Sequence, residues 1–170
     1  TIVTGGCIAS MLVQETVNDY DLYFRNLKTT EAVAHYYVAK FNSGARDLKV
    51  DSSDGRVRIV TKSGHRGETA GDVKTLTDSG EIEDVYEEAE QAALATEDEG
   101  KPKYRPVFLS TNAITLSHKV QIVLRFYGEP DDIHENYDFV HCTNFWTGWD
   151  NELVLRQAAL EALLARELRY

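Results

Sequence analysis

Two aspartates separated by one residue are the clearest candidates for chemistry in this sequence. Asp19 and Asp21 flank Tyr20 in the run DYDLYF, residues 19–24, whose alternation predicts a β-strand. Because side chains alternate between the faces of a strand, both carboxylates point the same way and repel each other. A divalent cation such as Mg²⁺ or Mn²⁺ is the simplest compensation. Both residues are therefore predicted metal ligands, and two solvated edge-strand aspartates are the alternative.

A glycine pair lies a short distance before these carboxylates. Gly5 and Gly6 precede an apolar stretch, residues 7–14, that reads as a short helix. Glycines at the start of a helix leave backbone N–H groups free to hold a phosphate. Phosphate, divalent cation and carboxylates together are what phosphoryl or nucleotidyl transfer requires.

The stretch TGGCIASMLVQETVNDYDLYF, residues 4–24, resembles the signature of the nucleotidyltransferase superfamily, which includes DNA polymerase beta and the tRNA CCA-adding enzymes. That signature is a glycine turn, a helix and then Asp-x-Asp on a strand. The resemblance implies that Asp19 and Asp21 bind the catalytic metals and that Gly5 and Gly6 contact the phosphates of a nucleoside triphosphate. The later segments QIVLRF and YDFVH also look like parts of nucleotidyltransferase-like proteins from viral and phage genomes.

The sequence departs from that pattern in two places. Ala9 and Ser10 stand where CCA-adding enzymes have Arg-Asp, which argues against CCA addition. The superfamily's third carboxylate, on a later strand, has Gln121 as its counterpart, and a neutral amide is a poor magnesium ligand. Asp138 is the expected substitute, as a metal ligand or a base, because it begins a predicted strand over 138–145. A parallel crossover from the strand over 118–127, through a helical turn at 131–137, would bring it to the carboxylate pair. The alternative for Asp138 is a turn-capping aspartate.

Two arginines are candidates for binding the triphosphate. Arg125 shares a strand face with Gln121, and Arg25 directly follows the strand that carries Asp21. An arginine in such a place requires an anion, which is either a phosphate or a carboxylate. Trp149 is expected to anchor the last helix, and His141 to be satisfied within the sheet.

The remaining pattern predicts an α/β or α+β domain with a nucleotidyltransferase-like mixed sheet and helices mainly on one face. A polar, acidic insertion at about 63–105 interrupts this single domain, and it contains a predicted helix near 81–95. The other predicted elements are a strand at 2–4, a helix at 31–42, strands at 56–62 and within 106–116, and a helix at about 152–168.

Composition limits the function further. The chain has 170 residues and a net charge of −10, which argues against a protein that coats nucleic acid by charge alone. Its two cysteines, Cys7 and Cys142, are expected to be free thiols in a reducing cytoplasm, that of the host if the protein is viral. No apolar run is long enough for a membrane span. The start at Thr1 suggests a fragment of a longer chain.

The leading hypothesis is therefore a nucleotidyltransferase that uses Mg²⁺ or Mn²⁺ and transfers a nucleoside monophosphate from an NTP to a hydroxyl of an RNA end, a protein or a small molecule. One alternative is a catalytically inactive binding or structural module of the same fold, associated with a virion. Another is an unrelated interaction domain in which the Asp-x-Asp spacing is accidental. The oligomeric state is left open.

Overall fold

The computed structural model describes residues 1–42, 48–61, 69–70, 73–76 and 100–170. In the described part of the chain, no helix has the length and apolar character needed to cross a membrane. The helix predicted near 81–95 lies outside the described residues.

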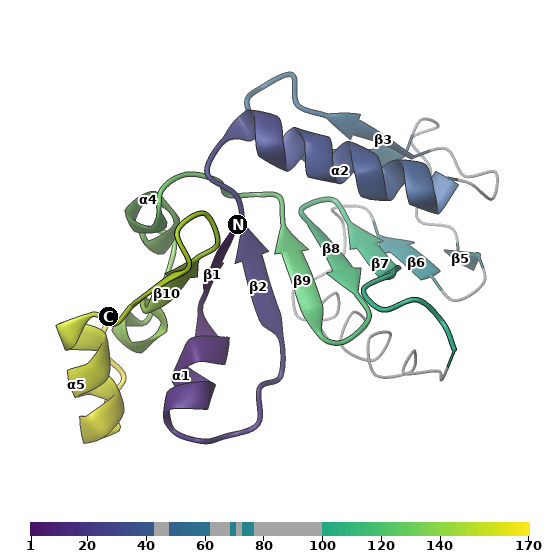
Figure 1. Ribbon diagram of the computed structural model, residues 1–170. Coiled ribbons are helices and arrows are strands. Elements are labelled where there is room, and N and C mark those ends of the chain that lie inside the picture. The colour runs from purple at the N-terminus through teal and green to yellow at the C-terminus, as the bar shows by residue number, and fades with distance from the viewer. Residues whose placement is uncertain (43–47, 62–68, 71–72, 77–99) are drawn as a thin grey trace.

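A mixed sheet organises the molecule, in the order β11-β10-β1-β2-β9-β8-β7-β6-β5 (Figure 1). The parallel pairs are β2 with β9 and β6 with β7, and the other neighbours are antiparallel. The mixed α+β class predicted from the sequence is therefore confirmed. The strands of this sheet are β1 (Ile2–Thr4), β2 (Tyr20–Tyr23), β5 (Thr69–Ala70), β6 (Val73–Leu76), β7 (Pro106–Ser110), β8 (Ala113–Leu116), β9 (Val120–Val123), β10 (Phe145–Thr147) and β11 (Glu152–Val154).

Helices cover the two faces of this sheet unequally. The longest, α2 (Leu27–Asn42), packs over β9, β8 and β7 through Ala34, Val38 and Phe41. A small hairpin of β3 (Leu48–Asp51) and β4 (Arg58–Thr61) closes this core. The short helix α4 (Pro130–His134) packs on the opposite face through Ile133. The other described helices are α1 (Gly6–Leu12), the 3₁₀ helix η1 (Val140–Cys142) and α5 (Gln157–Ala165).

The start of α2 differs from the prediction for a local reason. The sequence places the helix at 31–42, with Thr29 or Thr30 as its cap. Instead the Asn26 side-chain oxygen accepts a hydrogen bond from the Thr29 backbone N–H at 2.9 Å, and the helix begins at Leu27. Asparagine is among the strongest capping residues, because its oxygen satisfies a donor left open in the first turn.

The predicted strand over 138–145 is wrong, and so is the parallel crossover that depended on it. Residues 140–142 form η1, and the Thr143 hydroxyl donates to the Val140 carbonyl at 2.7 Å. Such a local bond offers the backbone an alternative to a strand ladder. The strand begins only at Phe145, and β10 then pairs antiparallel with β1 rather than beside β9.

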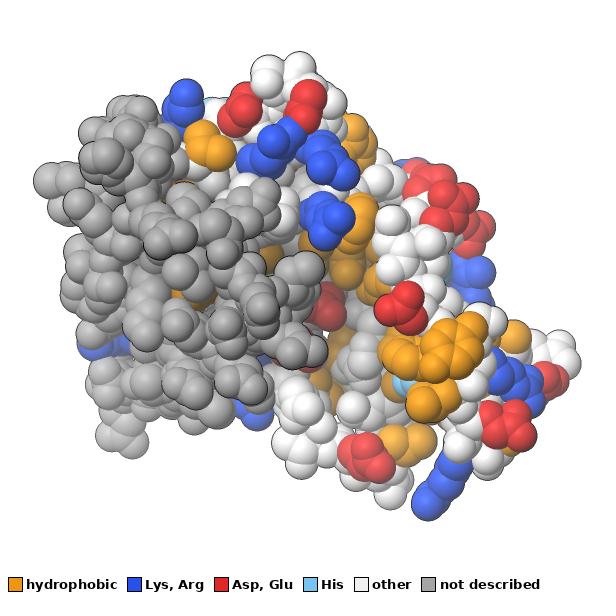
Figure 2. All heavy atoms as spheres, turned by 180° about the vertical axis from the view of Figure 1, so that it is seen from behind, with side chains coloured by type: hydrophobic (Ala, Val, Ile, Leu, Met, Phe, Trp, Pro, Cys, Tyr) orange, Lys and Arg blue, Asp and Glu red, His pale blue; other side chains and the backbone are white. Residues whose placement is uncertain are grey.

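The predicted C-terminal helix is also partly wrong. Residues 152–154 form β11, which pairs with β10 across a turn in which Asn151 has a φ of 56°. The helix α5 then spans only Gln157–Ala165 and buries Ala159 and Ala162. Leucines of the expected apolar stripe are exposed instead, including Leu153, Leu164 and Leu168. Figure 2, which shows the molecule from behind, has hydrophobic side chains at the surface on the side where α5 and β10 lie.

Candidate carboxylate site

Asp21 lies on β2, the strand that the alternation of DYDLYF predicted, and β2 is an interior strand of the sheet. It pairs with Thr4 of β1 on one side and with Gln121 of β9 on the other. Thr115 of β8 continues this polar row across the sheet. The neighbours Tyr20 and Leu22 face the groove on the opposite side of the sheet.

The carboxylates of this site repel each other. Burial and the negative charge of Asp19 together raise the pKa of Asp21 from 3.8 to about 7. Asp19 lies just before β2 and is exposed. Near neutral pH the free protein therefore holds Asp21 partly protonated, and a nearby cation would favour its ionised form.

Gly5 brings the start of α1 close to this carboxylate. It has a φ of 94°, and a Cβ added to it would lie 3.3 Å from Asp21 Oδ2 and 3.4 Å from the Tyr137 hydroxyl oxygen. Any other residue would be strained there and would crowd Asp21. Gly6 is exposed and has open space around its Cα. The Gly5 N–H already donates to the Cys142 carbonyl at 3.2 Å, which leaves the following N–H groups of α1 as the candidates for a phosphate.

The surroundings of Asp21 also contain groups that sequence reasoning missed. The Tyr137 hydroxyl donates to the Tyr23 hydroxyl at 3.1 Å, and the Cys7 thiol donates to the Thr4 carbonyl at 3.6 Å. Burial and the charge of Asp21 raise the pKa of Cys7 to about 11, and burial likewise raises the pKa of Tyr137. Both side chains are neutral at physiological pH. A signal for Cys7 was its place two residues after Gly5, whereas Tyr137 is brought there by tertiary structure.

The buried Thr4, which pairs with Asp21, connects the surroundings of Asp21 to α4. The Thr4 hydroxyl donates to the Asn144 carbonyl at 2.8 Å, and its oxygen lies 2.7 Å from Nε2 of His134. Burial lowers the pKa of His134 to about 4, so its ring is neutral at pH 7. With the threonine hydrogen directed to Asn144, the geometry favours the tautomer in which His134 Nε2–H donates to Thr4.

The donor set fits one hard cation. Asp19 and Asp21 supply carboxylate oxygens, and Gln121 lies in register beside Asp21 with a neutral amide oxygen. Magnesium sites commonly use one or two carboxylates, with waters and substrate phosphates completing the shell. Among the described residues there is no ready group of three His, Cys, Asp or Glu side chains for a metal. These donors are of the type that Mg²⁺ prefers, but the described part of the chain supplies fewer than three acidic ligands.

The other predicted site residues do not lie on the strands expected for them. Asp138 is exposed in the bend before η1, so the strand position that linked it to the carboxylates does not exist. His141 lies on η1 rather than in a strand. Arg125 follows the end of β9, is exposed, and has its guanidinium 5.2 Å from the Phe126 ring centre.

Arg25 has partners at the other end of β2. Its Nε donates to Glu129 at 2.8 Å, and its guanidinium lies 4.2 Å from the ring centre of Trp149. The anion it requires is thus a carboxylate in the free protein, which was the alternative to a phosphate. Trp149, expected to anchor the last helix, packs against this arginine.

The fold and site define an α+β protein with a glycine of positive φ close to a buried carboxylate on one face of a mixed sheet. A family model for the Gabija anti-defense 2 family matches residues 1–166, and the chain belongs to this family. Membership of an anti-defense family agrees with the expectation of a phage protein. No curated protein and no solved structure matches the chain.

Proposed function

We propose that this protein is a metal-dependent nucleotidyltransferase that acts against the Gabija defence in the host cytoplasm. The observation that carries the proposal is the contact of Gly5 with Asp21, next to Asp19. It brings the start of a helix close to Asp21, whose pKa is raised by burial and by the negative charge of Asp19. A bound cation would compensate the negative charges of the two carboxylates. An anionic substrate would accept hydrogen bonds from the backbone N–H groups at the start of the helix.

In the proposed reaction, an acceptor hydroxyl attacks the α-phosphorus of an NTP and loses its proton to solvent. A new P–O bond forms as the bond from the α-phosphorus to the bridging oxygen breaks, and pyrophosphate leaves with that oxygen. Bound Mg²⁺ or Mn²⁺ would neutralise the triphosphate and stabilise the leaving pyrophosphate. Asp19 and Asp21 would hold the ion. The N–H groups at the start of α1 would orient the phosphates.

Incubation with each of the four α-³²P-labelled NTPs, Mg²⁺ or Mn²⁺, and host RNA and protein tests this proposal. The expected result is label transfer to one acceptor fraction, with loss of transfer in both Asp19→Asn and Asp21→Asn. Glu15→Gln, at an exposed carboxylate, is the matched control and should keep full transfer. Circular dichroism of each variant verifies that the fold is intact.

A second candidate is an inactive module that opposes the defence by binding alone. Gln121 favours it, because this amide stands beside Asp21 where a third carboxylate would complete the metal site. The exposed bend at Asp138 supplies no substitute strand position. Metal-dependent NTP binding without label transfer or pyrophosphate release would support this second function and contradict the first.

A further inference from the structure

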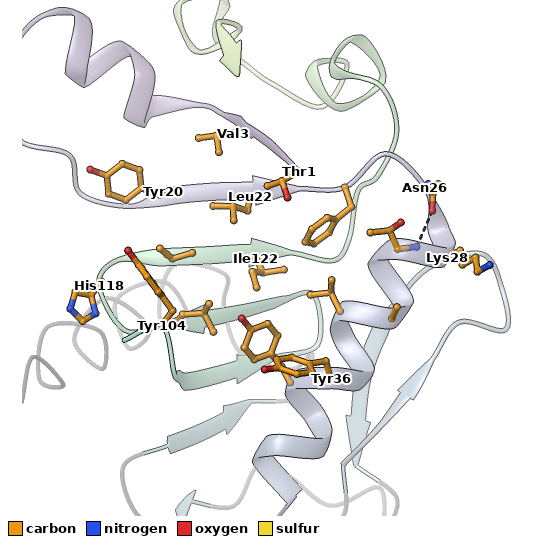
Figure 3. Close-up of a pocket in the computed structure, with 17 residues that line it drawn as sticks. Thr1, Val3, Tyr20, Leu22, Asn26, Lys28, Tyr36, Tyr104, His118 and Ile122 are labelled. Atoms are coloured by element: carbon orange, nitrogen blue, oxygen red, sulfur yellow. Dashed lines mark hydrogen bonds between the residues drawn. The ribbon is translucent and has the colours of Figure 1, made fainter. Parts of the chain in front are cut away.

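A large groove lies on the face of the sheet opposite Asp21 (Figure 3). It has a volume of about 1190 Å³, near or above the range of about 300–1,000 Å³ usual for small-molecule sites. Its floor is the apolar row Val3, Leu22 and Ile122, which are neighbours on β1, β2 and β9. The helix α2 forms one wall but packs mainly over β9, β8 and β7, which leaves the β1–β2 part of this face open.

Aromatic rings line this groove, and four of them lie in two pairs. Tyr104 and His118 lie at one end, with ring centres 5.5 Å apart. Tyr36 and Tyr37 project from α2, with ring centres 5.0 Å apart in an edge-to-face arrangement. Tyr36 and Tyr104 are each 53% exposed, and the Lys40 ammonium lies over the Tyr36 ring, 4.5 Å from its centre. Aromatic surfaces of this kind stack on nucleobases, since every base has a π-face.

Backbone structure positions the ring pair at the end of the groove. His118 and Lys119, with φ of 68° and 62°, form the tight turn between the antiparallel strands β8 and β9, and positive φ is usual in such turns. Tyr104 also has a positive φ, of 58°. The Ser117 N–H donates to the Arg105 carbonyl at 2.9 Å, which holds the two segments together and keeps the rings side by side at an open surface.

The charge of the groove is opposite to that of the whole molecule. The chain carries a net charge of −10, yet neither Asp nor Glu is among the described residues that line the groove. Lys28 is the charged lining residue there, apart from the titratable His118. In Figure 3 it lies with Asn26 at the end away from Tyr104. The lining therefore favours a ligand that is aromatic along its length and anionic at one end.

We propose that this groove binds a nucleotide, with its base on the tyrosine rings and its phosphate toward Lys28, as a site separate from the carboxylates. The groove does not depend on the proposed transferase activity, because β2 turns Tyr20 and Leu22 to one face and Asp21 to the other. Its binding should need no metal.

Isothermal titration with AMP and the dinucleotide ApA, in EDTA, tests the site directly. Both are expected to bind, adenosine more weakly, and ribose 5-phosphate not measurably. In protein with labelled methyl groups, the signals of Leu22, Val120 and Ile122 should shift on addition of AMP. EDTA separates this binding from any that requires Mg²⁺ at Asp19 and Asp21.

Variants at exposed lining residues then assign the contacts. Tyr36→Ala and Tyr104→Ala should each weaken AMP binding by about five- to 150-fold, since a stacked ring contributes about 1–3 kcal/mol per base. Lys28→Met should weaken AMP but leave adenosine unchanged. Tyr170→Ala and Lys49→Met are the matched controls, as exposed residues that do not line the groove.

Three outcomes would overturn the proposal. They are no AMP or ApA binding at millimolar concentration, binding that the Tyr36, Tyr104 and Lys28 variants leave unchanged, and binding that Asp21→Asn abolishes. The last outcome would place the nucleotide at the carboxylates instead. Failure of label transfer, in contrast, bears only on the transferase and leaves this site standing.

Discussion

Replacement of Asp21 by asparagine should stabilise the protein, and the gain should depend on pH. The pKa of Asp21 is about 7 in the folded protein against an ordinary value of 3.8. Between those values the folded state keeps a proton that the unfolded state has lost. The contribution of Asp21 to the free energy of unfolding therefore falls as pH rises from about 4 to 7, and the penalty is complete above 7.

The size of this effect follows from the difference in pKa. About three pKa units at 1.36 kcal/mol each give an upper limit of about 4 kcal/mol. Relaxation and solvent around a partly exposed carboxylate reduce it, so about 2–4 kcal/mol is expected at pH 8. At about pH 4, Asp21 is protonated in the folded state and about half protonated in the unfolded state, so the two proteins should differ by less than about 1 kcal/mol.

Urea unfolding of wild type and Asp21→Asn at pH 4, 6 and 8, without divalent ions, measures this difference. Glu15→Gln serves as the control and should change the free energy of unfolding by less than about 0.5 kcal/mol. The reasoning is refuted if Asp21→Asn is less stable than wild type at pH 8, or if its advantage is equal at pH 4 and pH 8. Added Mg²⁺ should stabilise wild type at pH 8, by about 2.7 kcal/mol at 100 times its dissociation constant, and should leave Asp21→Asn unchanged.

Three further predictions concern the surroundings of Asp21. Gly5→Ala should lower the free energy of unfolding by about 1–3 kcal/mol, because a φ of 94° is strained for alanine. Gly6→Ala, at a position with open space around it, should not lower it. Equal losses for the two variants in urea unfolding would contradict this prediction. Thr4→Val should cost about 1–3 kcal/mol, since the Asn144 carbonyl and His134 lose their partner, and a neutral result in thermal unfolding would show that water replaces it. Gln121→Asp should destabilise the protein at pH 8, because it adds a like charge beside Asp21, and Mg²⁺ should restore the lost stability. A loss of stability that persists at saturating Mg²⁺ would show that residue 121 does not reach the ion.

The part of the fold that was predicted correctly depends on the alternation of side chains along short strands. Tyr20, Asp21 and Leu22 alternate in a strand, and β1 and β9 then fix which face each side chain joins. The close approach of Gly5 to Asp21 follows from the spacing of glycine turn, helix and strand, because a short helix returns the chain to the neighbouring strand.

Non-local structure accounts for what the sequence could not supply. The run over 138–145 has strand-like residues, yet the hydroxyl of Thr143 bonds within its own turn and the strand starts at Phe145. The run over 152–154 suits a helix or a strand, and its pairing with β10 decides between them. The Tyr137 hydroxyl lies close to Gly5 because α4 packs against the residues of β1. No local sequence pattern predicts this packing.

The shortness of β2 has a consequence for how the protein changes over time. Four residues of this strand form the floor of an aromatic groove on one side and the wall of a carboxylate cluster on the other. A slip of one residue in pairing would exchange the two surfaces, placing charge in the groove and leucine beside Gly5. One antiparallel and one parallel neighbour hold the register from both sides. Insertions and deletions in this strand should therefore be selected against. The two surfaces must then diversify by substitution alone, at alternate positions of the strand.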